Sequence, residues 1–199
     1  MDNETRSDLN DIIIEAIEVF INHILYTRDV YPSQIFKKRR IYNTPVLASI
    51  YPPLNTYLYK VLRTIRELLK TGELDGVEVV LYKDDVETYE RYRFQIKPLT
   101  ERISVEDEFL MDMEEQLRAC LYSLAERVKT LEKLPADCKF KVLIYTNQVG
   151  FVRLSHNPHY QDFPWLRSDL KCSNSKQEIS LLPLTSLRTI GLLLTAEIS

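Results

Sequence analysis

Glycine, cysteine and a dominant charge are all scarce in this chain. Its 199 residues include only 4 glycines and 3 cysteines, and the net charge at pH 7 is −3. So few glycines exclude a glycine-rich loop that would cradle phosphates. The odd number and wide spacing of the cysteines argue for reduced intracellular thiols and against a disulfide framework. The small net charge gives no overall field that would indicate nucleic-acid binding.

Long apolar runs are missing too. No stretch approaches the ~18 consecutive apolar residues that a membrane helix needs. The polar start of the chain lacks the basic-then-apolar order of a signal peptide. We therefore expect a soluble cytosolic or nuclear protein with no membrane partner. With 45% hydrophobic residues, the chain has enough material for the core of a single domain over residues 1–199.

Motifs for catalysis or metal binding are equally hard to find. Gly-x-Ser-x-Gly, a P-loop and His-Glu-x-x-His do not occur. His156 and His159 form the one close histidine pair, but no third metal ligand follows at a suitable spacing, so a polar loop explains them better. Acidic pairs such as Asp84-Asp85 fall where a turn is expected. We expect no catalytic residue, no cofactor and no metal, and therefore a protein that is not an enzyme.

Three segments have the periodicity of helices. Residues 7–29 carry a narrow polar stripe from Asp8 to Asn22 on an otherwise apolar helix, with Ser7 as the N-cap. Residues 52–71 begin at a proline pair and stop at Gly72. The longest helix is expected over Ser104 to Leu134, with an apolar seam along one side. Too few heptads fit that seam for a coiled coil, so it predicts a helix packed on a sheet.

Strands are expected between these helices. Val77 to Tyr82 is apolar on both faces, as in a buried strand. Thr88 to Lys97 alternates between aromatic and charged residues, and the short link through Lys83 to Val86 predicts a hairpin. Phe140 to Thr146 is a third strand. The order of these elements predicts an α+β fold, an antiparallel sheet packed on three helices, and argues against a dinucleotide-binding fold.

Regular patterning breaks down in the last quarter, Gln148 to Ser199. Apolar patches replace it, and the only tryptophan, Trp165, lies among them. A disordered tail would be depleted in such residues, and a structureless loop of this length is improbable unless it is functional. We expect an irregular apolar segment, residues 148–199, that lies against a core of residues 1–147 and covers something else.

Two charged features have more than one interpretation. The run Lys37-Lys38-Arg39-Arg40, in the loop expected after the first helix, suits a nuclear import signal, a nucleic-acid contact or a solvated loop. Arg118 lies on the exposed flank of the long helix, where it suits a protein contact or a solvated face.

Several pieces of the sequence, in this order and at these separations, together resemble one family. They are Ile24-Leu25-Tyr26, Asp29-Val30-Tyr31-Pro32, Ile35-Phe36 with the basic run, Tyr42-Asn43, Pro45-Val46, Pro53-Leu54-Asn55 with Tyr57, Glu115-Gln116-Leu117-Arg118-Ala119, Asp162-Phe163-Pro164-Trp165 and Leu182-Pro183-Leu184. The sequence resembles the HORMA-domain proteins over nearly its whole length. Within the family it is most similar to the accessory, non-catalytic subunits of translesion DNA polymerase zeta.

The resemblance implies a role for the tail. In HORMA proteins the C-terminal segment wraps as a "seatbelt" over a short partner peptide, which pairs with the core as an added strand. By resemblance, Tyr57, Phe163, Pro164 and Trp165 would hold a proline-containing peptide of the catalytic subunit of polymerase zeta. Flat aromatic rings suit proline rings physically.

The resemblance also implies further partners. Arg118 and Lys38 match a surface through which HORMA domains form homo- or heterodimers. Leu181 and Pro183 match a surface for the C-terminal domain of a Y-family scaffold polymerase, although the residues after Ser186 depart from the family pattern. An AAA+ remodeller is a further implied partner, and the implied location is the nucleus and also the cytoplasm.

These features favour an adaptor that joins the two polymerases during bypass of damaged DNA. The alternative in the same class is a mitotic spindle-checkpoint HORMA protein that binds a cell-cycle regulator. A small enzyme that uses its tail as an active-site lid would need a cluster of titratable groups beneath that lid, and the sequence suggests none.

Overall fold

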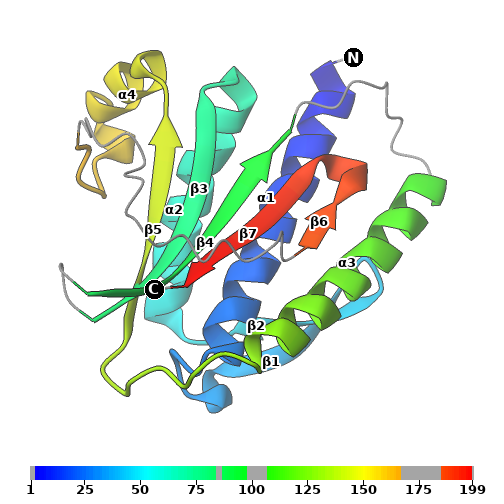
Figure 1. Ribbon diagram of the computed structural model, residues 1–199. Coiled ribbons are helices and arrows are strands. Elements are labelled where there is room, and N and C mark those ends of the chain that lie inside the picture. The colour runs from blue at the N-terminus through cyan, green and yellow to red at the C-terminus, as the bar shows by residue number, and fades with distance from the viewer. Residues whose placement is uncertain (1–2, 84–86, 98–106, 167–184, 199) are drawn as a thin grey trace.

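The computed structural model describes residues 3–83, 87–97, 107–166 and 185–198, and it has the predicted α+β architecture. Its centre is a five-stranded sheet in the order β5-β3-β4-β7-β6, with every neighbouring pair antiparallel. The strands are β3 (Leu74–Tyr82), β4 (Thr88–Ile96), β5 (Lys139–Thr146), β6 (Thr185–Leu187) and β7 (Leu192–Ile198). Helices α1 (Asn3–Thr27) and α2 (Pro52–Thr71) lie behind the sheet, and α3 (Asp107–Val128) runs along its β6 side (Figure 1). The expected antiparallel sheet on three helices is confirmed.

Local signals explain where the helices stop. As predicted, α2 starts at its proline pair and ends at Gly72, whose left-handed φ of 71° suits glycine. Helix α1 ends at Thr27. Just beyond it Asp29 also has a left-handed φ of 53°, and the amide of Val30 bonds back to the carbonyl of Leu25. It begins at Asn3, so the expected N-cap at Ser7 is wrong, because the helix continues through that residue.

The expected end of α3 at Leu134 is also wrong. The helix stops at Val128, and the following amides, those of Thr130 and Leu131, bond to carbonyls three residues back. The hydroxyl of Thr130 also donates to the carbonyl of Arg127 at 2.7 Å. In a continued helix this carbonyl would accept from a backbone amide of the next turn, so the side chain competes with the helix. The predicted seam is confirmed from Met113 to Val128, where its residues are buried. The expected start of this helix at Ser104, and the hairpin link through Asp84, Asp85 and Val86, lie outside the described residues.

The basic run is a strand, so the expected loop there is wrong. Strand β1 (Phe36–Ile41) pairs with β2 (Thr44–Ser49) as a separate two-stranded sheet. The two residues between them, Tyr42 and Asn43, both have positive φ, 46° and 59°, as a two-residue hairpin turn of type I′ requires. The sequence hides this strand because four of its six residues are exposed, so no alternation of apolar and polar residues marks it.

The tail is more regular than expected. It contains helix α4 (Gln148–Ser155) and the strands β6 and β7, and β7 pairs with both β4 and β6 inside the sheet. Leu192, Leu194 and Ala196 of β7 are buried, whereas the residues between them are only partly covered. This alternation is the signal of a half-buried strand. Short 3₁₀ turns complete the chain, at Ser33–Ile35, Pro158–Tyr160 and Arg188–Ile190.

A buried ion pair joins distant parts of the molecule. The guanidinium of Arg28 binds both carboxylate oxygens of Glu90, one of them at 2.9 Å, and the two side chains are 6% and 2% exposed. Arg28 also donates to the backbone carbonyl of Glu132 at 2.6 Å, and the hydroxyl of Tyr92 donates to Glu90 at 2.7 Å. These bonds satisfy the buried charges, which would otherwise be costly.

In the part of the chain that the structure describes, none of the helices has the length and apolar composition of a membrane-spanning segment.

We expect that removing either charge of this pair alone will strongly destabilise the fold. Arg28→Met would leave a buried carboxylate without its cation, and Glu90→Gln would leave a buried guanidinium, each at a cost of about 3–5 kcal/mol. The double variant should lose less than the sum of the two, because no unpaired charge remains and the glutamine can still accept from Tyr92. Chemical denaturation measures all three free energies of unfolding. Arg66→Met is the control, since the side chains of Arg66 and its partner Asp11 are 43% and 47% exposed. Additive losses would show that the pair is not energetically coupled.

Candidate functional site

Strand β5 forms one edge of the sheet, and among the described strands it pairs with β3 alone. The amide of Val142 points away from β3, because it donates to the hydroxyl of Tyr57 at 3.0 Å. Backbone groups alternate in direction along a strand, so the amides of Phe140 and Ile144 point outward as well. An edge of this kind can accept a further strand.

An aromatic cluster lies beside this edge. It consists of Tyr31, Tyr51, Tyr57, Phe140 and Phe163. Tyr57 from α2 meets Phe140 of β5 and Phe163 of the tail edge to face, with ring centroids 5.5 and 5.8 Å apart. Tyr31 meets Phe140 at 5.9 Å and Tyr51 at 6.3 Å. Burial raises the pKa of Tyr57, so its hydroxyl stays protonated at neutral pH. The cluster brings together four segments of the chain at one end of β5.

Trp165 takes a different position from Phe163. Its indole nitrogen donates to the carbonyl of Tyr160 at 2.7 Å, and its ring meets Phe151 of α4 edge to face at 6.2 Å. Trp165 is half-buried, and Pro164 between the two aromatic residues is exposed. The structure therefore brings Tyr57 and Phe163 into direct contact and places Trp165 against α4.

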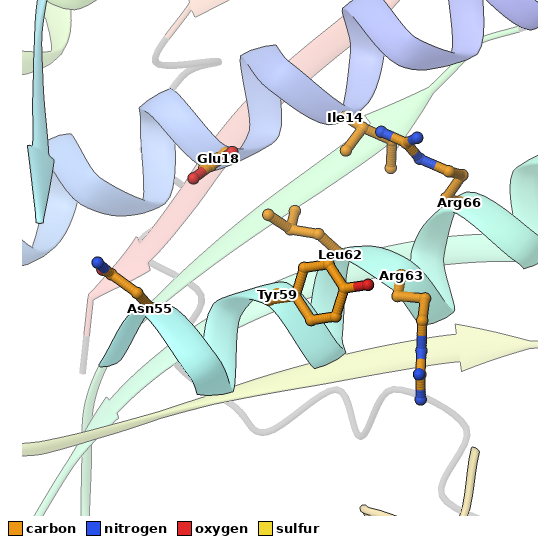
Figure 2. Close-up of a pocket in the computed structure, with 7 residues that line it drawn as sticks. All are labelled: Ile14, Glu18, Asn55, Tyr59, Leu62, Arg63 and Arg66. Carbon is orange, nitrogen blue, oxygen red and sulfur yellow. The ribbon is translucent and has the colours of Figure 1, made fainter. Parts of the chain in front are cut away.

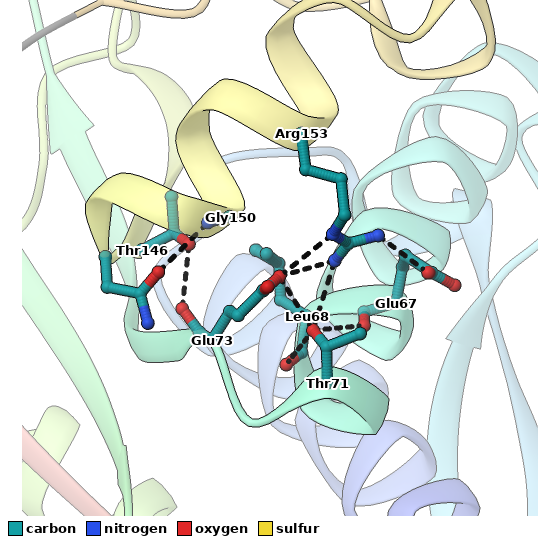
Figure 3. Close-up of polar contacts among 8 residues, drawn as sticks. Glu67, Leu68, Thr71, Glu73, Thr146, Gly150 and Arg153 are labelled. Carbon is teal, nitrogen blue, oxygen red and sulfur yellow. Dashed lines mark hydrogen bonds and ion pairs between the residues drawn. The ribbon is translucent and has the colours of Figure 1, made fainter.

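The tail segment that carries Phe163 and Trp165 follows helix α4. Arg153 holds this helix to the end of α2 (Figure 3). The guanidinium of Arg153 donates to Glu67 at 2.9 Å, to Glu73 at 3.1 Å and to the hydroxyl of Thr71 at 3.1 Å. The hydrogen bond from Arg153 lowers the pKa of Glu73. Because these contacts join residues 80 or more positions apart, no local pattern in the sequence indicates them.

Gly150 allows α4 to approach the core closely (Figure 3). A Cβ at this position would lie 3.0 Å from Leu68 and 3.1 Å from Glu73, closer than real Cβ contacts normally come. Asn147 caps the helix, since its side-chain oxygen accepts from the amide of Gly150 at 2.9 Å. Asparagine is a favoured N-cap residue, so Asn147 is a local signal for the start of this helix.

A model of the HORMA domain matches residues 10–162 of this chain. The chain belongs to the HORMA-domain family. Over 184 residues it is 43% identical to "DNA polymerase zeta subunit 2" of Drosophila melanogaster, covering 92% of both chains. It is 35% identical to "Mitotic spindle assembly checkpoint protein MAD2B" of Danio rerio, covering 92% of this chain and 89% of that one.

Solved structures show the same fold. A chain in the crystal structure of the mitotic checkpoint complex has a TM-score of 0.74 at 19% identity, covering 97% of this chain and 96% of that one. The structure of HTP-2 bound to HTP-3 motif-6 has a TM-score of 0.66 at 16% identity, covering 100% and 98%. At these identities the likeness concerns the fold.

The two residues matched to the HORMA dimer surface lie on neighbouring elements. Arg118 is exposed on α3 and pairs with Glu114 of the same helix. Lys38 is exposed on β1. The hairpin that carries Lys38 reaches α3 through Thr44, whose hydroxyl donates to the carbonyl of Glu114 at 3.2 Å. Leu181 and Pro183, matched to the scaffold-polymerase surface, lie outside the described residues.

The exposed side of α3 has an apolar as well as a charged part. Met111 and Tyr122 are both 71% exposed. They lie seven residues before and four residues after Arg118, so all three share one side of the helix. This side of the helix therefore has a mixed apolar and charged character.

This HORMA domain also has a groove of about 260 Å³ between α1 and α2 (Figure 2). None of the expected site residues line it. Its lining residues are Ile14, Glu18, Asn55, Tyr59, Leu62, Arg63 and Arg66.

Within the described residues, no group of three histidine, cysteine or acidic side chains could hold a metal ion. The ring of His156 contacts the carbonyl of Val152 at 2.9 Å.

Proposed function

We propose that this HORMA domain is a non-catalytic adaptor that holds a short, proline-containing peptide of a partner protein on the edge of β5. The observation that carries the proposal is the outward-facing edge of β5 beside the aromatic cluster, with Phe163 of the tail already packed on Tyr57. The peptide would add as a strand, and the segment 148–199 would cover it as a seatbelt.

The chemistry of this edge suits such a peptide. The outward amides of Phe140 and Ile144 would donate to carbonyls of the added strand, and main-chain bonds of this kind give affinity without requiring particular side chains. Proline has no amide hydrogen, so it fits an edge strand only where no donor is needed. The amide of Val142 already has a partner in the hydroxyl of Tyr57, so the added strand needs no carbonyl acceptor at that point. A peptide proline would be accommodated beside the flat rings of Tyr57 and Phe163, with Trp165 further along the tail.

The relatives support one particular partner for this role. The similarity to a polymerase zeta subunit supports the catalytic subunit of polymerase zeta as the source of the peptide, and nuclear translesion synthesis as the process. We further propose that Leu181 and Pro183 contact the C-terminal domain of a Y-family scaffold polymerase. The domain would thus connect the two polymerases.

A second candidate is a mitotic adaptor, which the relative with a spindle-checkpoint name favours. In that role the same edge would hold a segment of a cell-cycle regulator. Matched pull-downs distinguish the two, one with a proline-containing segment of the polymerase catalytic subunit and one with a segment of a mitotic regulator. Retention of the mitotic segment alone would replace the polymerase assignment.

Loss of the Trp165 side chain should weaken peptide binding. A large aromatic contact at a hot spot is worth roughly 2–4 kcal/mol, so Trp165→Ala should reduce affinity for the polymerase peptide about 30-fold or more. Tyr57→Ala should act in the same direction, whereas Tyr59→Ala is the control, because Tyr59 is 66% exposed and faces the α1–α2 groove. Titration calorimetry measures the affinities. Equal binding by wild type and both site variants would remove these residues from the site.

Hydrogen exchange should reveal the added strand directly. Peptide binding should slow exchange at the outward amides of Phe140 and Ile144, because each gains a carbonyl partner. The neighbouring amides of Lys141 and Leu143 face β3 in the pairing of β5 with β3 and serve as internal controls. Residue-resolved exchange by NMR measures all four. Binding that leaves the two outward amides unchanged would exclude strand addition at β5.

Self-association should depend on Arg118 and not on the peptide site. Arg118→Glu reverses a charge on the exposed side of α3, so we expect loss of the dimer while peptide affinity stays within a few-fold. Lys129→Glu, just beyond the end of α3, is a control with the same change of charge. Sedimentation at matched concentrations measures the association. A wild-type protein that remains monomeric with its peptide bound would remove the dimer role from Arg118 and Lys38.

A further inference from the structure

Two basic residues of α2 hold the tail segment that immediately precedes Phe163. Lys60 donates to one carboxylate oxygen of Asp162 at 2.8 Å, and Arg63 lies 3.4 Å from the other. Arg63 also donates to the backbone carbonyl of His159. Its guanidinium carbon lies 5.1 Å from the centre of the Tyr160 ring. These five residues, Lys60, Arg63, His159, Tyr160 and Asp162, form what we call the α2 latch.

The latch is connected to both aromatic residues of the tail. Asp162 directly precedes Phe163, which packs on Tyr57 three residues before Lys60 on the same helix. Tyr160, whose ring lies against Arg63, accepts the indole hydrogen of Trp165 on its carbonyl. A chain of contacts therefore runs from Arg63 through Tyr160 to Trp165.

We propose that Lys60 and Arg63 are positioning residues for the clamp: by holding Asp162 and Tyr160 they fix Phe163 and Trp165 in place and so set how long a bound peptide remains. This proposal rests on the proposed function. A tail whose aromatic residues are already in position loses less conformational entropy when it closes on a peptide. Differences in affinity between variants of one interface arise mainly in the dissociation rate.

The charge of the latch distinguishes it from the aromatic packing beside it. The side chains of Lys60, Arg63 and Asp162 are 38%, 34% and 36% exposed, so salt can screen their attraction. The hydrogen bond from Lys60 also lowers the pKa of Asp162, which keeps the carboxylate charged at neutral pH. Salt should loosen the latch and leave the contact between Tyr57 and Phe163 in place.

The free protein provides a direct readout, because Trp165 is its only tryptophan. In Lys60→Met/Arg63→Met, and more weakly in Asp162→Asn, fluorescence of Trp165 should shift to the red and be quenched more readily by acrylamide. Asp162→Glu keeps the charge and should restore most of the wild-type signal. Lys70→Met removes an exposed positive charge from the same helix and is the control. Thermal unfolding verifies that each variant is folded. If the double variant does not fold, Asp162→Asn alone provides the test.

Peptide release is the second measurement. With a proline-containing segment of the polymerase zeta catalytic subunit, the double variant should release the peptide about tenfold faster, with little change in the association rate. Salt should accelerate release from the wild type and have little further effect on the double variant. If folded variants show unchanged quenching and unchanged peptide release, Lys60 and Arg63 do not position the tail. The proposed peptide clamp would still stand in that case. If the wild type binds no such peptide, the proposed function fails, and the Trp165 signal alone decides whether the latch orders the tail.

Discussion

The ion pair between Arg28 and Glu90 fixes the centre of the molecule. Arg28 follows α1, Glu90 belongs to β4, and the carbonyl that Arg28 also binds lies after α3. Strand β4 pairs with β3 on one side and with β7 on the other. Its position therefore determines that of β5, which is attached through β3, and that of the C-terminal strand. Both the edge proposed to receive a peptide and the end of the tail depend on this one buried carboxylate and its cation.

Features with a local cause could be predicted from the sequence. The proline pair and Gly72 define α2, the apolar seam defines the buried side of α3, and alternation defines β4. Features that depend on distant partners could not. Arg28 and Glu90 are 62 positions apart and neither differs locally from a solvated charge. The basic strand β1 could not be predicted, because most of its residues stay exposed when it pairs with β2 and no alternation marks it.

Some contacts of the candidate site could likewise be expected from the sequence, and others could not. The proximity of Tyr57 and Phe163 followed from the family resemblance and not from any pattern in the residues, and the structure places the two rings together. Nothing local indicated that Arg153 would hold α4 to α2, or that Lys60 and Arg63 would reach Asp162, because each contact spans more than 80 positions. The regular strand β7 was hidden within an apolar patch whose alternation is visible only once its neighbours in the sheet are known.

The hydrogen bond from Val142 to Tyr57 has a consequence for the protein when it is alone. An unprotected edge strand invites pairing with the edge of another copy, which leads to aggregation. The hydroxyl of Tyr57 occupies an outward amide in the middle of β5, and its ring packs against the ring of Phe140 on the same strand. A second sheet that approached this edge would have to leave one of its own carbonyls without a donor at that point, or displace an aromatic side chain from its packing. The tyrosine thus protects the edge against indiscriminate pairing, and selects for a ligand that does not need a bond at that point.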